Sequence, residues 1–385
     1  MNPKSQSLND LRGEMDRIDG ELVRLLCERM ETAAKIAEYK RGAGKPVYDP
    51  VREREKLNAV AALAGEEFGG AARRVWEVLM EVSKDWQNRL NRVPSPLYET
   101  IVRAASESAP FPVNARIACQ GAEGAYSTAA AEKLFSHHPD VVYESSFGEV
   151  LDAVENGQVR YGILPAENTI AGPVNEVWRL LERRNVFIVR SVRVKAEHCL
   201  LVNPGTALSD VREVVSHEQA LSQCGSFLDS LGEVKVTRAA NTAVAARAVR
   251  DSGRSDLAAI SSERCAVLYG LETAARSIQN AANNVTRFLC VSKEPEIDPD
   301  ADRSTVVLVT PNEPGALYRV LSRFQAAGIN LTALHAQPIE GRDFEFRFRL
   351  DFECPVRLPF FAELMQTVAD ECEEFRYLGA YSEII

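Results

Sequence analysis

Residues 161–169 read YGILPAENT, an apolar run that ends in a glutamate, an asparagine and a threonine. A short apolar run bounded by turn-forming residues is typical of a buried strand. Comparable runs recur along residues 114–292, and helical patterns alternate with them. One such pattern comprises Phe147, Val150, Leu151 and Val154. Strands that alternate with helices predict a two-lobed, doubly wound, parallel α/β domain, in which residues 186–202 could cross between the lobes.

Residues 1–92 differ from this pattern and are predicted to be all-helical. Between residues 7 and 42, apolar residues recur at spacings of three and four, which predicts one long helix. Two shorter helices are expected, one from Asp49-Pro50 to about residue 64 and one over residues 71–90. A helix of roughly 50 Å is too long for so small a domain to bury alone. Its apolar stripe therefore needs a partner, such as a second copy of the chain.

Two proline-bearing segments divide the chain. The first, residues 93–113, contains four prolines, and the second, residues 293–303, is acidic. Both are predicted to be linkers, and the first could contain a helical turn around residues 98–105. The last segment, residues 303–385, shows patterns in the order strand, helix, strand, strand, helix, strand, which predicts a ferredoxin-like fold. The expected fold class is therefore a multidomain protein with all-α and α/β parts.

Length and composition limit the classes to which the protein can belong. The 385 residues exceed what one core usually supports, and 45% hydrophobic with 26% charged residues is ordinary for a globular chain. The formal charge of −10 argues against a nucleic-acid partner. No apolar run is long enough to span a membrane, and the N-terminal stretch does not resemble a secretory signal. The eight cysteines lack metal-ligand spacing, so we expect a cytoplasmic protein without a bound metal.

Cationic residues stand among apolar positions on the predicted long helix. Arg29 and Lys40 are 11 residues apart (40 − 29), which places them on one face, within about 20° and roughly 16 Å of each other. Two long side chains at that separation can close around a small dianion. Arg12 lies about 100° around the helix from Arg29, and an antiparallel dimer could deliver it from the second subunit. From spacing alone, a solvated helix face with ion pairs is the commoner outcome.

Residues 7–91 resemble the all-helical chorismate mutase domain in the stretches LNDLRGEMDRIDGELVRLLCERMETAAKIAEYK, PVYDPVREREKL and EVSKDWQ. The resemblance implies that this domain rearranges chorismate to prephenate. It also implies a substrate pocket made of Arg12, Arg29, Lys40, Asp49, Arg52, Glu53, Ser83 and Gln87. The cations would orient the two carboxylates, and Lys40 and Gln87 would stabilise the charge that builds on the ether oxygen. Glu53 would contact the ring hydroxyl or, when protonated, the ether oxygen.

Polar side chains lie at the ends of the predicted strands in the α/β domain. Asn168 and Thr169 end the strand quoted above, Ser216 ends another, and Thr286 and Arg287 begin a third. Ligands of open α/β sheets lie outside the carboxyl ends of strands, so these residues are candidates for a site that binds a small carboxylate. Taken alone, each polar residue at a strand–helix junction is more typical of a helix cap.

Four motifs in this domain, taken in order, resemble prephenate dehydratase over residues 115–292. In this chain they read GAEGAYS, PAENT, SHEQALSQC and NNVTRF. The resemblance implies that catalysis requires Thr286 and that a cleft is lined by Asn168, Thr169, Ser216, Gln219, Gln223 and Arg287. The implied reaction releases the ring carboxylate as CO₂ and the C4 hydroxyl as water, and Thr286 would donate a hydrogen bond to that hydroxyl. The source of the proton stays open.

The C-terminal segment resembles an ACT regulatory domain through PGALYRVL, residues 314–321. The resemblance implies an amino-acid effector site at Gly315, Ala316 and Leu317, and pairing of the domain across a dimer. Members inhibited by phenylalanine carry Glu-Ser-Arg-Pro on the next strand, whereas this chain has HAQP at residues 335–338. Feedback by phenylalanine is therefore an open question.

Taken together, most of the chain resembles the bifunctional chorismate mutase–prephenate dehydratases of phenylalanine biosynthesis. The resemblance implies a homodimer or larger homo-oligomer that acts on chorismate and prephenate, with no cofactor, nucleic acid or membrane partner. Two alternatives remain: a monofunctional prephenate dehydratase with a helical dimerisation domain, and a sensor that binds a small carboxylate. The sequence leaves open whether arogenate is accepted and whether prephenate passes directly between sites.

Overall fold

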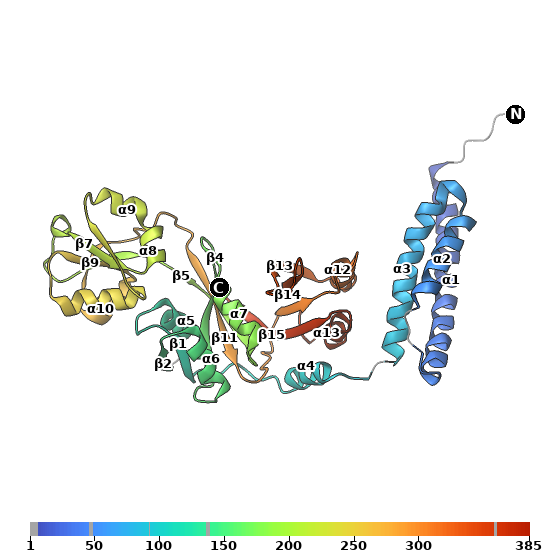
Figure 1. The fold of residues 1–385 in the computed structure, drawn as a ribbon, viewed down its shortest axis with the longest axis horizontal. Helices are drawn as coiled ribbons and strands as arrows, with labels where there is room; N and C mark the ends of the chain where they lie inside the picture. The colour runs from blue at the N-terminus through green and yellow to red at the C-terminus, as the bar shows by residue number, and fades with distance from the viewer. Residues whose placement is uncertain (1–6, 46–48, 92, 136–138, 358–359) are drawn as a thin grey trace. The chain divides into compact units, whose positions relative to one another are not determined.

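The computed structural model describes residues 7–45, 49–91, 93–135, 139–357 and 360–385. The chain forms two compact units, Met1–Pro94 and Ser95–Ile385, which we call the helical unit and the α/β unit (Figure 1). The predicted domain boundaries at residues 1 and 92 lie outside the described residues. Within the described ranges, no helix is both long enough and apolar enough to cross a membrane.

The described part of the helical unit contains α1 (Leu8–Gly42), α2 (Pro50–Leu63) and α3 (Gly65–Asn91). The long helix predicted from residue 7 begins directly after Ser7. The Ser7 hydroxyl accepts from the backbone N–H of Asp10, and the Asp10 carboxylate accepts from that of Ser7, which satisfies two free donors at the helix end. α3 packs against α1 and α2, and Ala33, Ala37 and Val60 are buried at these contacts.

The N-terminal half of α1 carries an exposed apolar stripe. Leu8, Leu11, Met15, Ile18 and Leu22 are between 39% and 63% exposed. These residues recur every three or four positions, so they lie on one side of the helix. Apolar surface left in water costs about 25 cal/mol per Å². One chain therefore buries only Ala33 and Ala37 of α1 and leaves this stripe to water.

The first sheet of the α/β unit has mixed strand directions. Its strands up to residue 292 are β1 (Arg116–Gln120), β2 (Asp140–Glu144), β3 (Tyr161–Asn168), the short β4 (Gly172–Pro173), β5 (Phe187–Lys195) and β11 (Val285–Ser292). Helices α5 (Tyr126–Leu134), α6 (Phe147–Glu155) and α7 (Asn175–Arg183) pack on it. β1 pairs in parallel with β2 and β3, whereas β11 pairs antiparallel with β3 and β5. The prediction of a parallel sheet is wrong for β11, which joins the sheet when the chain returns from the second lobe. It is also wrong for two strand pairs of the second sheet, which are antiparallel.

The second sheet forms the other lobe, in the strand order β10-β6-β9-β7-β8. The strands are β6 (Cys199–Val202), β7 (Glu213–Ser216), β8 (Lys235–Arg238), β9 (Leu257–Ser261) and β10 (Glu272–Ala275). Its helices are η1 (Leu208–Asp210), α8 (Glu218–Gln223), α9 (Gly225–Ser230), α10 (Thr242–Ser252) and α11 (Glu263–Tyr269), and Figure 1 shows α8, α9 and α10 around the sheet. The chain crosses between the lobes from Lys195 to Cys199, inside the stretch predicted to cross.

The C-terminal segment continues the first sheet. It comprises β12 (Arg303–Val309), α12 (Ala316–Ala326), β13 (Asn330–Pro338), β14 (Phe346–Glu353), α13 (Phe361–Asp370) and β15 (Glu374–Ile384), with strand order β13-β14-β12-β15. Residues 382–384 of β15 pair in parallel with β5. Gly379 (φ 137°) lies where a Cβ would collide with the backbone carbonyl of Ile188, so this crossing requires glycine. The segment expected as a separate domain therefore shares one sheet, and one compact unit, with residues 114–292.

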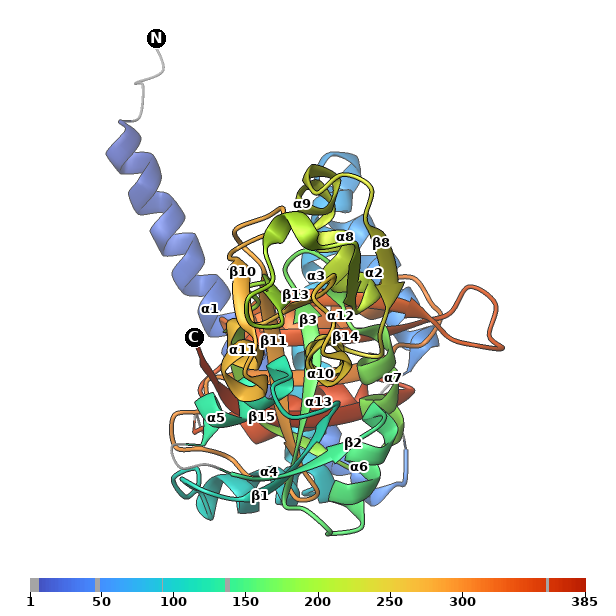
Figure 2. The same cartoon turned by 90° about the vertical axis from the view of Figure 1, so that its left-hand side faces the viewer.

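Residues 93–113, predicted to be a linker, contain a packed helix. α4 (Pro96–Ser106) begins at Ser95, whose hydroxyl accepts from the backbone N–H of Tyr98. It lies beside α13 (Figures 1 and 2) and buries Ile101 and Ala104 in the core of the C-terminal segment. The two prolines at the start and the two near the end of this stretch thus mark the ends of a helix that belongs to the α/β unit.

Candidate active sites

The helical unit brings Arg29, Ser83 and Gln87 together where α1 faces α3. Arg29 donates from Nη1 to the carbonyl oxygen of Leu79 at 3.0 Å and contacts the hydroxyl of Ser83. Ser83 donates to the same carbonyl at 2.9 Å, and Gln87 donates from Nε2 to the carbonyl oxygen of Ser83 at 3.2 Å. Ser83 and Gln87 are buried, and burial lowers the pKa of Arg29. These three predicted site residues form one polar cluster inside the bundle.

A second polar cluster joins α2 to α3. Nζ of Lys84 lies 3.2 Å from Oε1 of Glu53 and 2.7 Å from Oε1 of Glu81. Burial disfavours the ammonium group, but the two carboxylates outweigh that cost and raise the pKa of Lys84. Glu53 is among the predicted site residues, whereas sequence reasoning missed Lys84. Its place between Ser83 and Gln87 on α3 is the signal that could have identified it.

Four other predicted residues of the helical unit lie nearer its surface. Asp49 caps α2, because its Oδ1 accepts from the backbone N–H of Arg52 at 3.0 Å. The side chain of Arg52 is exposed, and Lys40, in the last turn of α1, is half-buried. Arg12 is exposed within the apolar stripe of α1. Seventeen residues of one straight helix (29 − 12), or about 25 Å, separate it from Arg29, so one chain does not assemble the whole predicted pocket.

The α/β unit contains a cavity of about 320 Å³ between its two sheets. The cavity is lined by the carboxyl ends of β1 and β3, the first turns of α5 and α6, helix α8, the segment before α10 and the start of β11. Its polar lining residues are Gln120, Tyr126, Ser127, Asn168, His198, His217, Gln219, Gln223, Asn241, Thr242, Asn284 and Thr286. A polar cavity at the carboxyl ends of parallel strands is where ligands of such folds bind.

Asn168 and Thr286 face each other across this cavity wall. They are opposite residues of the antiparallel pair β3 and β11, and Nδ2 of Asn168 donates to Oγ1 of Thr286 at 3.0 Å. The Thr286 oxygen therefore accepts a hydrogen bond from the protein, which leaves its own proton for a group in the cavity. Asn168 also donates to Oδ1 of Asn284 at 2.8 Å. Both Asn168 and Thr286 are among the predicted site residues.

Gln223 and His198 extend this set of contacts to the second lobe. Oε1 of Gln223 accepts from Nδ2 of Asn284 at 2.9 Å and lies 2.9 Å from Nε2 of His198. His198 is buried, and burial lowers its pKa, although the contact with Gln223 acts in the opposite direction. Sequence reasoning found Gln223 in a motif but missed His198. A lone histidine between two apolar strands carries no local signal of a polar site.

Three predicted dehydratase residues do not line this cavity. Arg287 projects from the opposite face of β11, where it donates to the hydroxyl of Tyr381 at 2.6 Å. The hydroxyl of Thr169 donates to the carbonyl oxygen of Asn283 at 2.7 Å, which ties the end of β3 to the start of β11. Arg287 and Thr169 line a different cavity, of about 660 Å³, next to the C-terminal segment. Ser216 is fully buried, and its hydroxyl donates to a backbone carbonyl of β9 at 2.6 Å.

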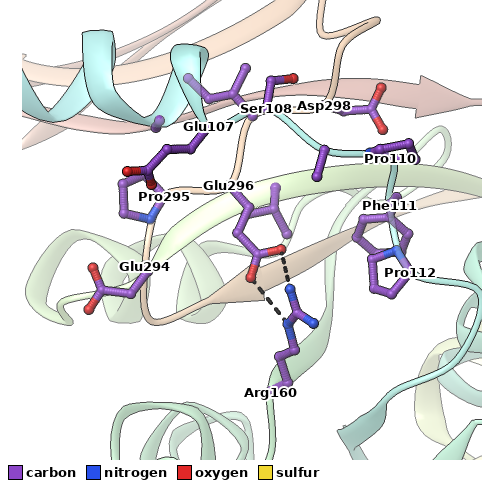
Figure 3. Close-up of a pocket in the computed structure, with 14 residues that line it drawn as sticks. Glu107, Ser108, Pro110, Phe111, Pro112, Arg160, Glu294, Pro295, Glu296 and Asp298 are labelled. Atoms are coloured by element: carbon purple, nitrogen blue, oxygen red, sulfur yellow. Dashed lines mark hydrogen bonds and ion pairs between the residues drawn. The ribbon is translucent and has the colours of Figure 1, made fainter.

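A further cavity, of about 250 Å³, lies between residues 107–112 and residues 294–298 (Figure 3). It is rich in carboxylates, but Glu296 is already paired. Arg160 donates to it from Nε and Nη2 at 3.3 and 3.1 Å, and the hydroxyl of Tyr161 donates at 2.6 Å. These contacts fasten the segment after β11 to the start of β3, so we assign this cavity no ligand.

The predicted effector residues stand at the start of α12. Gly315 has a φ of 82° and precedes the helix, Ala316 is buried and Leu317 is half-buried. A positive φ favours glycine, so Gly315 is required by the turn. His335, in the stretch where the sequence departs from the phenylalanine-inhibited pattern, pairs across strands with Arg349.

Comparison with known families assigns both parts of the chain. Residues 11–88 match the family model described as chorismate mutase type II, and residues 117–296 match the model described as prephenate dehydratase. The match to chorismate mutase covers the three helices, and the match to prephenate dehydratase covers both lobes with the cavity between them.

Relatives of known activity extend over most of the chain. An arogenate dehydratase/prephenate dehydratase of Arabidopsis thaliana is 35% identical, covering 78% of this chain and 81% of its own. A bifunctional chorismate mutase/prephenate dehydratase of Aquifex aeolicus is 29% identical, covering 99% of both chains.

Two solved structures match the α/β part of the chain. The structure of GqqA, described as a novel type of quorum quenching acylase, is 32% identical (TM-score 0.62) and covers 69% of this chain and 97% of its own. A prephenate dehydratase from Arthrobacter aurescens in complex with L-Phe is 24% identical (TM-score 0.64) and covers 69% of this chain and 89% of its own. The chain belongs to the prephenate dehydratase family and carries a chorismate mutase domain, as the bifunctional chorismate mutase/prephenate dehydratases of phenylalanine biosynthesis do.

Proposed function

We propose that the helical unit rearranges chorismate in a pocket shared between two copies of the chain. The observation that carries this proposal is the exposed apolar stripe of α1, which contains Arg12. A second α1 laid antiparallel along the stripe buries it and carries Arg12 of one copy toward Arg29 of the other. The homodimer is therefore part of the mutase site as well as a means of covering apolar surface.

The roles of the mutase residues follow from the chemistry of a unimolecular rearrangement. Arg12, Arg29 and Arg52 hold the two carboxylates of chorismate, so that the enolpyruvyl arm lies over the ring. Lys40 and Gln87 stabilise the negative charge that develops on the ether oxygen as its bond to the ring breaks. One N–H of Gln87 is already used by a backbone carbonyl, and the other remains for this oxygen.

Asp49, Glu53 and Ser83 complete the proposed mutase pocket. Glu53 lies 3.2 Å from the ammonium group of Lys84, and one of its oxygens accepts a hydrogen bond from the ring hydroxyl of chorismate. Ser83 orients Arg29, and Asp49 fixes the start of α2, where Arg52 lies.

The dehydratase reaction is assigned to the cavity between the two sheets. The bond between the ring and its carboxylate breaks, CO₂ leaves, and that electron pair forms the new ring double bond. The bond from C4 to its hydroxyl breaks at the same time, and the hydroxyl leaves as water after it gains a proton. Thr286 donates a hydrogen bond to the departing oxygen, because its own oxygen accepts from Asn168. Gln219 and Gln223 bind the carboxylates of prephenate.

We assign Arg287, Thr169 and Ser216 supporting roles in place of direct substrate contacts. Each makes hydrogen bonds or ion pairs within the protein outside the cavity that contains Thr286. Arg287 fixes the start of β11, which presents Thr286, and Thr169 fixes the end of β3, which presents Asn168. Ser216 joins β7 to β9 below the first turn of α8, which carries Gln219.

The C-terminal segment is proposed to be an ACT-like module that binds an amino acid. The turn at Gly315-Ala316-Leu317 supplies backbone groups, and the strand with His335, Ala336 and Gln337 lies in the same module. Because Glu-Ser-Arg is replaced here, we expect L-phenylalanine to inhibit the dehydratase less than in relatives that carry those residues. Titration of the dehydratase rate with L-phenylalanine, L-tyrosine and L-tryptophan measures this, and half-inhibition by micromolar L-phenylalanine contradicts it.

One coupled assay on the purified chain tests the two activities together. Chorismate is supplied, and prephenate and phenylpyruvate are measured separately over time. Both products must appear, with prephenate first. Prephenate and arogenate are then compared as direct substrates of the dehydratase, since the Arabidopsis relative is named for both. Formation of prephenate without phenylpyruvate contradicts the dehydratase assignment, and the absence of both products contradicts the mutase assignment.

A further inference from the structure

The hydrogen bonds of Asn168 fix the orientation of its side-chain amide. Oδ1 accepts from the backbone N–H groups of Ile170 and Ala171, at 3.0 and 2.9 Å. A backbone N–H can only donate, so the atom facing both groups must be the oxygen. Nδ2 is therefore the nitrogen, which faces Asn284 at 2.8 Å and Thr286 at 3.0 Å, with the carbonyl oxygen of Val285 farther away at 3.3 Å.

The orientation of Asn168 fixes the orientations of the next two amides. Asn284 receives a hydrogen from Asn168 at 2.8 Å, so that atom of Asn284 is the oxygen and its Nδ2 is a donor. That Nδ2 lies 2.9 Å from Gln223, which must present its oxygen. Oε1 of Gln223 also lies 2.9 Å from Nε2 of His198. Because this oxygen has no hydrogen to give, Nε2 of His198 must carry one.

We infer that His198 is a positioning residue of the dehydratase, which holds Gln223 through an Nε2–H donor so that the amide nitrogen of Gln223 points at the substrate. This inference rests on the dehydratase site proposed above. Both described contacts of the Gln223 side chain go to its oxygen, and its two Nε2 hydrogens remain for a ligand in the cavity. Carboxylate oxygens of prephenate are suitable acceptors for them.

The surroundings of His198 favour this role. The side chain is 3% exposed, and its ring meets that of Tyr126 edge to face, with the centroids 5.9 Å apart. The Tyr126 hydroxyl has one hydrogen and two acceptors within reach, Nδ1 of His198 at 3.3 Å and the backbone carbonyl oxygen of Glu197 at 2.8 Å. Burial lowers the pKa of His198, which keeps the ring neutral at physiological pH. A buried neutral ring that packs against Tyr126 and donates to Gln223 is rigid enough to orient its partner.

The geometry also argues against His198 as the acid that protonates the leaving hydroxyl. Three amide groups separate its Nε2 from Thr286, namely those of Gln223, Asn284 and Asn168. An amide donates and accepts through different atoms, so it passes a proton onward only through an unstable imidic acid form. His198 therefore acts on the orientation of Gln223, and the proton reaches the leaving group by another route.

A double-mutant cycle in the full-length chain tests the inference. His198→Phe removes the donor, His198→Gln places an amide N–H near the Nε2 position, and both are made with and without Gln223→Ala. His198→Phe is expected to raise the KM for prephenate about tenfold and to change kcat by less than about threefold, since one hydrogen bond to a binding group is lost. His198→Gln is expected to restore most of that loss.

The coupling between positions 198 and 223 shows whether His198 acts through Gln223. In the Gln223→Ala background, His198→Phe is expected to change the KM by less than about twofold, because its effect acts through Gln223. Equal effects of His198→Phe in both backgrounds, or a His198→Gln enzyme as impaired as His198→Phe, overturn the inference. Failure of the dehydratase assignment itself looks different, because the wild-type chain then forms no phenylpyruvate.

The state of the ring gives an independent readout. Nitrogen-15 NMR of imidazole-labelled protein distinguishes the two neutral tautomers, and the His198 signal is identified among the five histidines by its loss in His198→Gln. The neutral Nε2–H form is expected in the wild-type chain. An Nδ1–H form overturns the inference, because His198 then has no hydrogen on Nε2 to donate to the oxygen of Gln223.

Discussion

The guanidinium carbon of Arg349 lies 3.6 Å from the centre of the Trp178 ring. Arg349 belongs to β14 of the C-terminal segment, and Trp178 belongs to α7 of the first lobe. Nε1 of Trp178 donates to the carbonyl oxygen of Ala166 at 2.9 Å, two residues before Asn168 on β3. The C-terminal segment therefore contacts, through one stacked pair, the strand that positions the proposed dehydratase site.

Arg349→Met is expected to lower the free energy of unfolding of the α/β unit by about 1–2 kcal/mol, because a buried cation–π contact is lost. Trp178 is the sole tryptophan beyond residue 94, so its fluorescence in a Trp76→Phe/Trp86→Phe background reports this unit alone during urea unfolding. Arg347→Met, on the same strand but paired with Glu182 and Glu374, is the control. An unchanged emission maximum in Arg349→Met contradicts the stacking.

A second connection runs through Arg287. Its guanidinium lies 3.3 Å from Glu383 and 3.6 Å from Asp351, and Tyr381 accepts from it at 2.6 Å. Burial alone lowers the pKa of Arg287, but these neighbours outweigh it and raise the pKa. The Tyr381 hydroxyl also lies 2.7 Å from the hydroxyl of Thr305.

Tyr381→Phe is expected to destabilise the α/β unit by about 1–3 kcal/mol, since Arg287 and Thr305 each lose a buried partner. Because Arg287 follows Thr286 on β11, the dehydratase kcat should fall as well, while the mutase rate of the separate helical unit stays unchanged. Tyr269→Phe is the matched control, because its hydroxyl donates to a single backbone carbonyl near the surface. Equal stability of the two variants argues against a structural role for the Arg287 contacts.

Thr286 and Arg287 also mark how far the sequence could predict the site. A motif places both side by side in the chain, and the resemblance assigned both to the cleft. Successive side chains of a strand point to opposite faces, so the two cannot share one wall of a cavity. Thr286 lines the cavity between the lobes, and Arg287 contacts the C-terminal segment.

Two other differences between prediction and structure arise from contacts between residues that are distant in the sequence. His198 was missed because its partner Gln223 lies 25 residues away and on another element (223 − 198), which no local pattern reveals. The C-terminal segment was expected to be separate because its own pattern of elements is complete. Its last strand nevertheless pairs with β5, a contact between residues about 190 positions apart (382 − 190). Periodicity predicted the elements themselves, including α1, expected over residues 7–42 and found as Leu8–Gly42, because it reports local burial.

Arg29→Ala is expected to reduce the mutase kcat/KM at least about 100-fold, because a cation that orients the substrate is removed. The dehydratase rate with added prephenate should stay unchanged. Arg24→Ala, on the same helix but exposed and paired with Glu28, is the control and should retain full mutase activity. A normal mutase rate in Arg29→Ala contradicts the pocket assignment.

Mixing two inactive variants tests whether the mutase site is shared. Arg12→Ala and Arg29→Ala chains, each inactive as a homodimer, are unfolded together and refolded. If Arg12 serves the site of the other copy, half of the dimers are mixed and each has one intact site, so about a quarter of the wild-type activity returns. If mass measurement shows that mixed dimers have formed but no mutase activity returns, Arg12 does not contribute to the site of the partner.

Thr286→Val is expected to reduce the dehydratase kcat at least about 100-fold, because the shape is kept but the hydroxyl donor is lost. Thr286→Ser keeps the hydroxyl and should stay within about tenfold of the wild-type kcat. Both variants should form prephenate from chorismate at the normal rate, which serves as the internal control. If Thr286→Val and Thr286→Ser lose the same activity, the hydroxyl is not the group that acts on the leaving oxygen.

The lowered pKa of His198 makes the stability of the α/β unit depend on pH. In the unfolded chain a histidine takes up a proton near pH 6.5, whereas in the folded chain burial delays this to lower pH. The unfolded state therefore binds more protons as the pH falls below 6.5, and the contribution of neutral His198 to stability is lost there. One such proton changes the free energy of unfolding by at most about 1.4 kcal/mol per pH unit.

His198→Gln removes this component. The free energy of unfolding is measured for both proteins at pH 7.5 and 5.5 by Trp178 fluorescence. Between these pH values, that of His198→Gln should fall by about 1 kcal/mol less than that of the wild type. His335, whose pKa burial also lowers, is present in both proteins and cancels in the comparison. Identical pH dependence in the two proteins means that the folded ring titrates like an exposed histidine, which is incompatible with a neutral imidazole held between Tyr126 and Gln223.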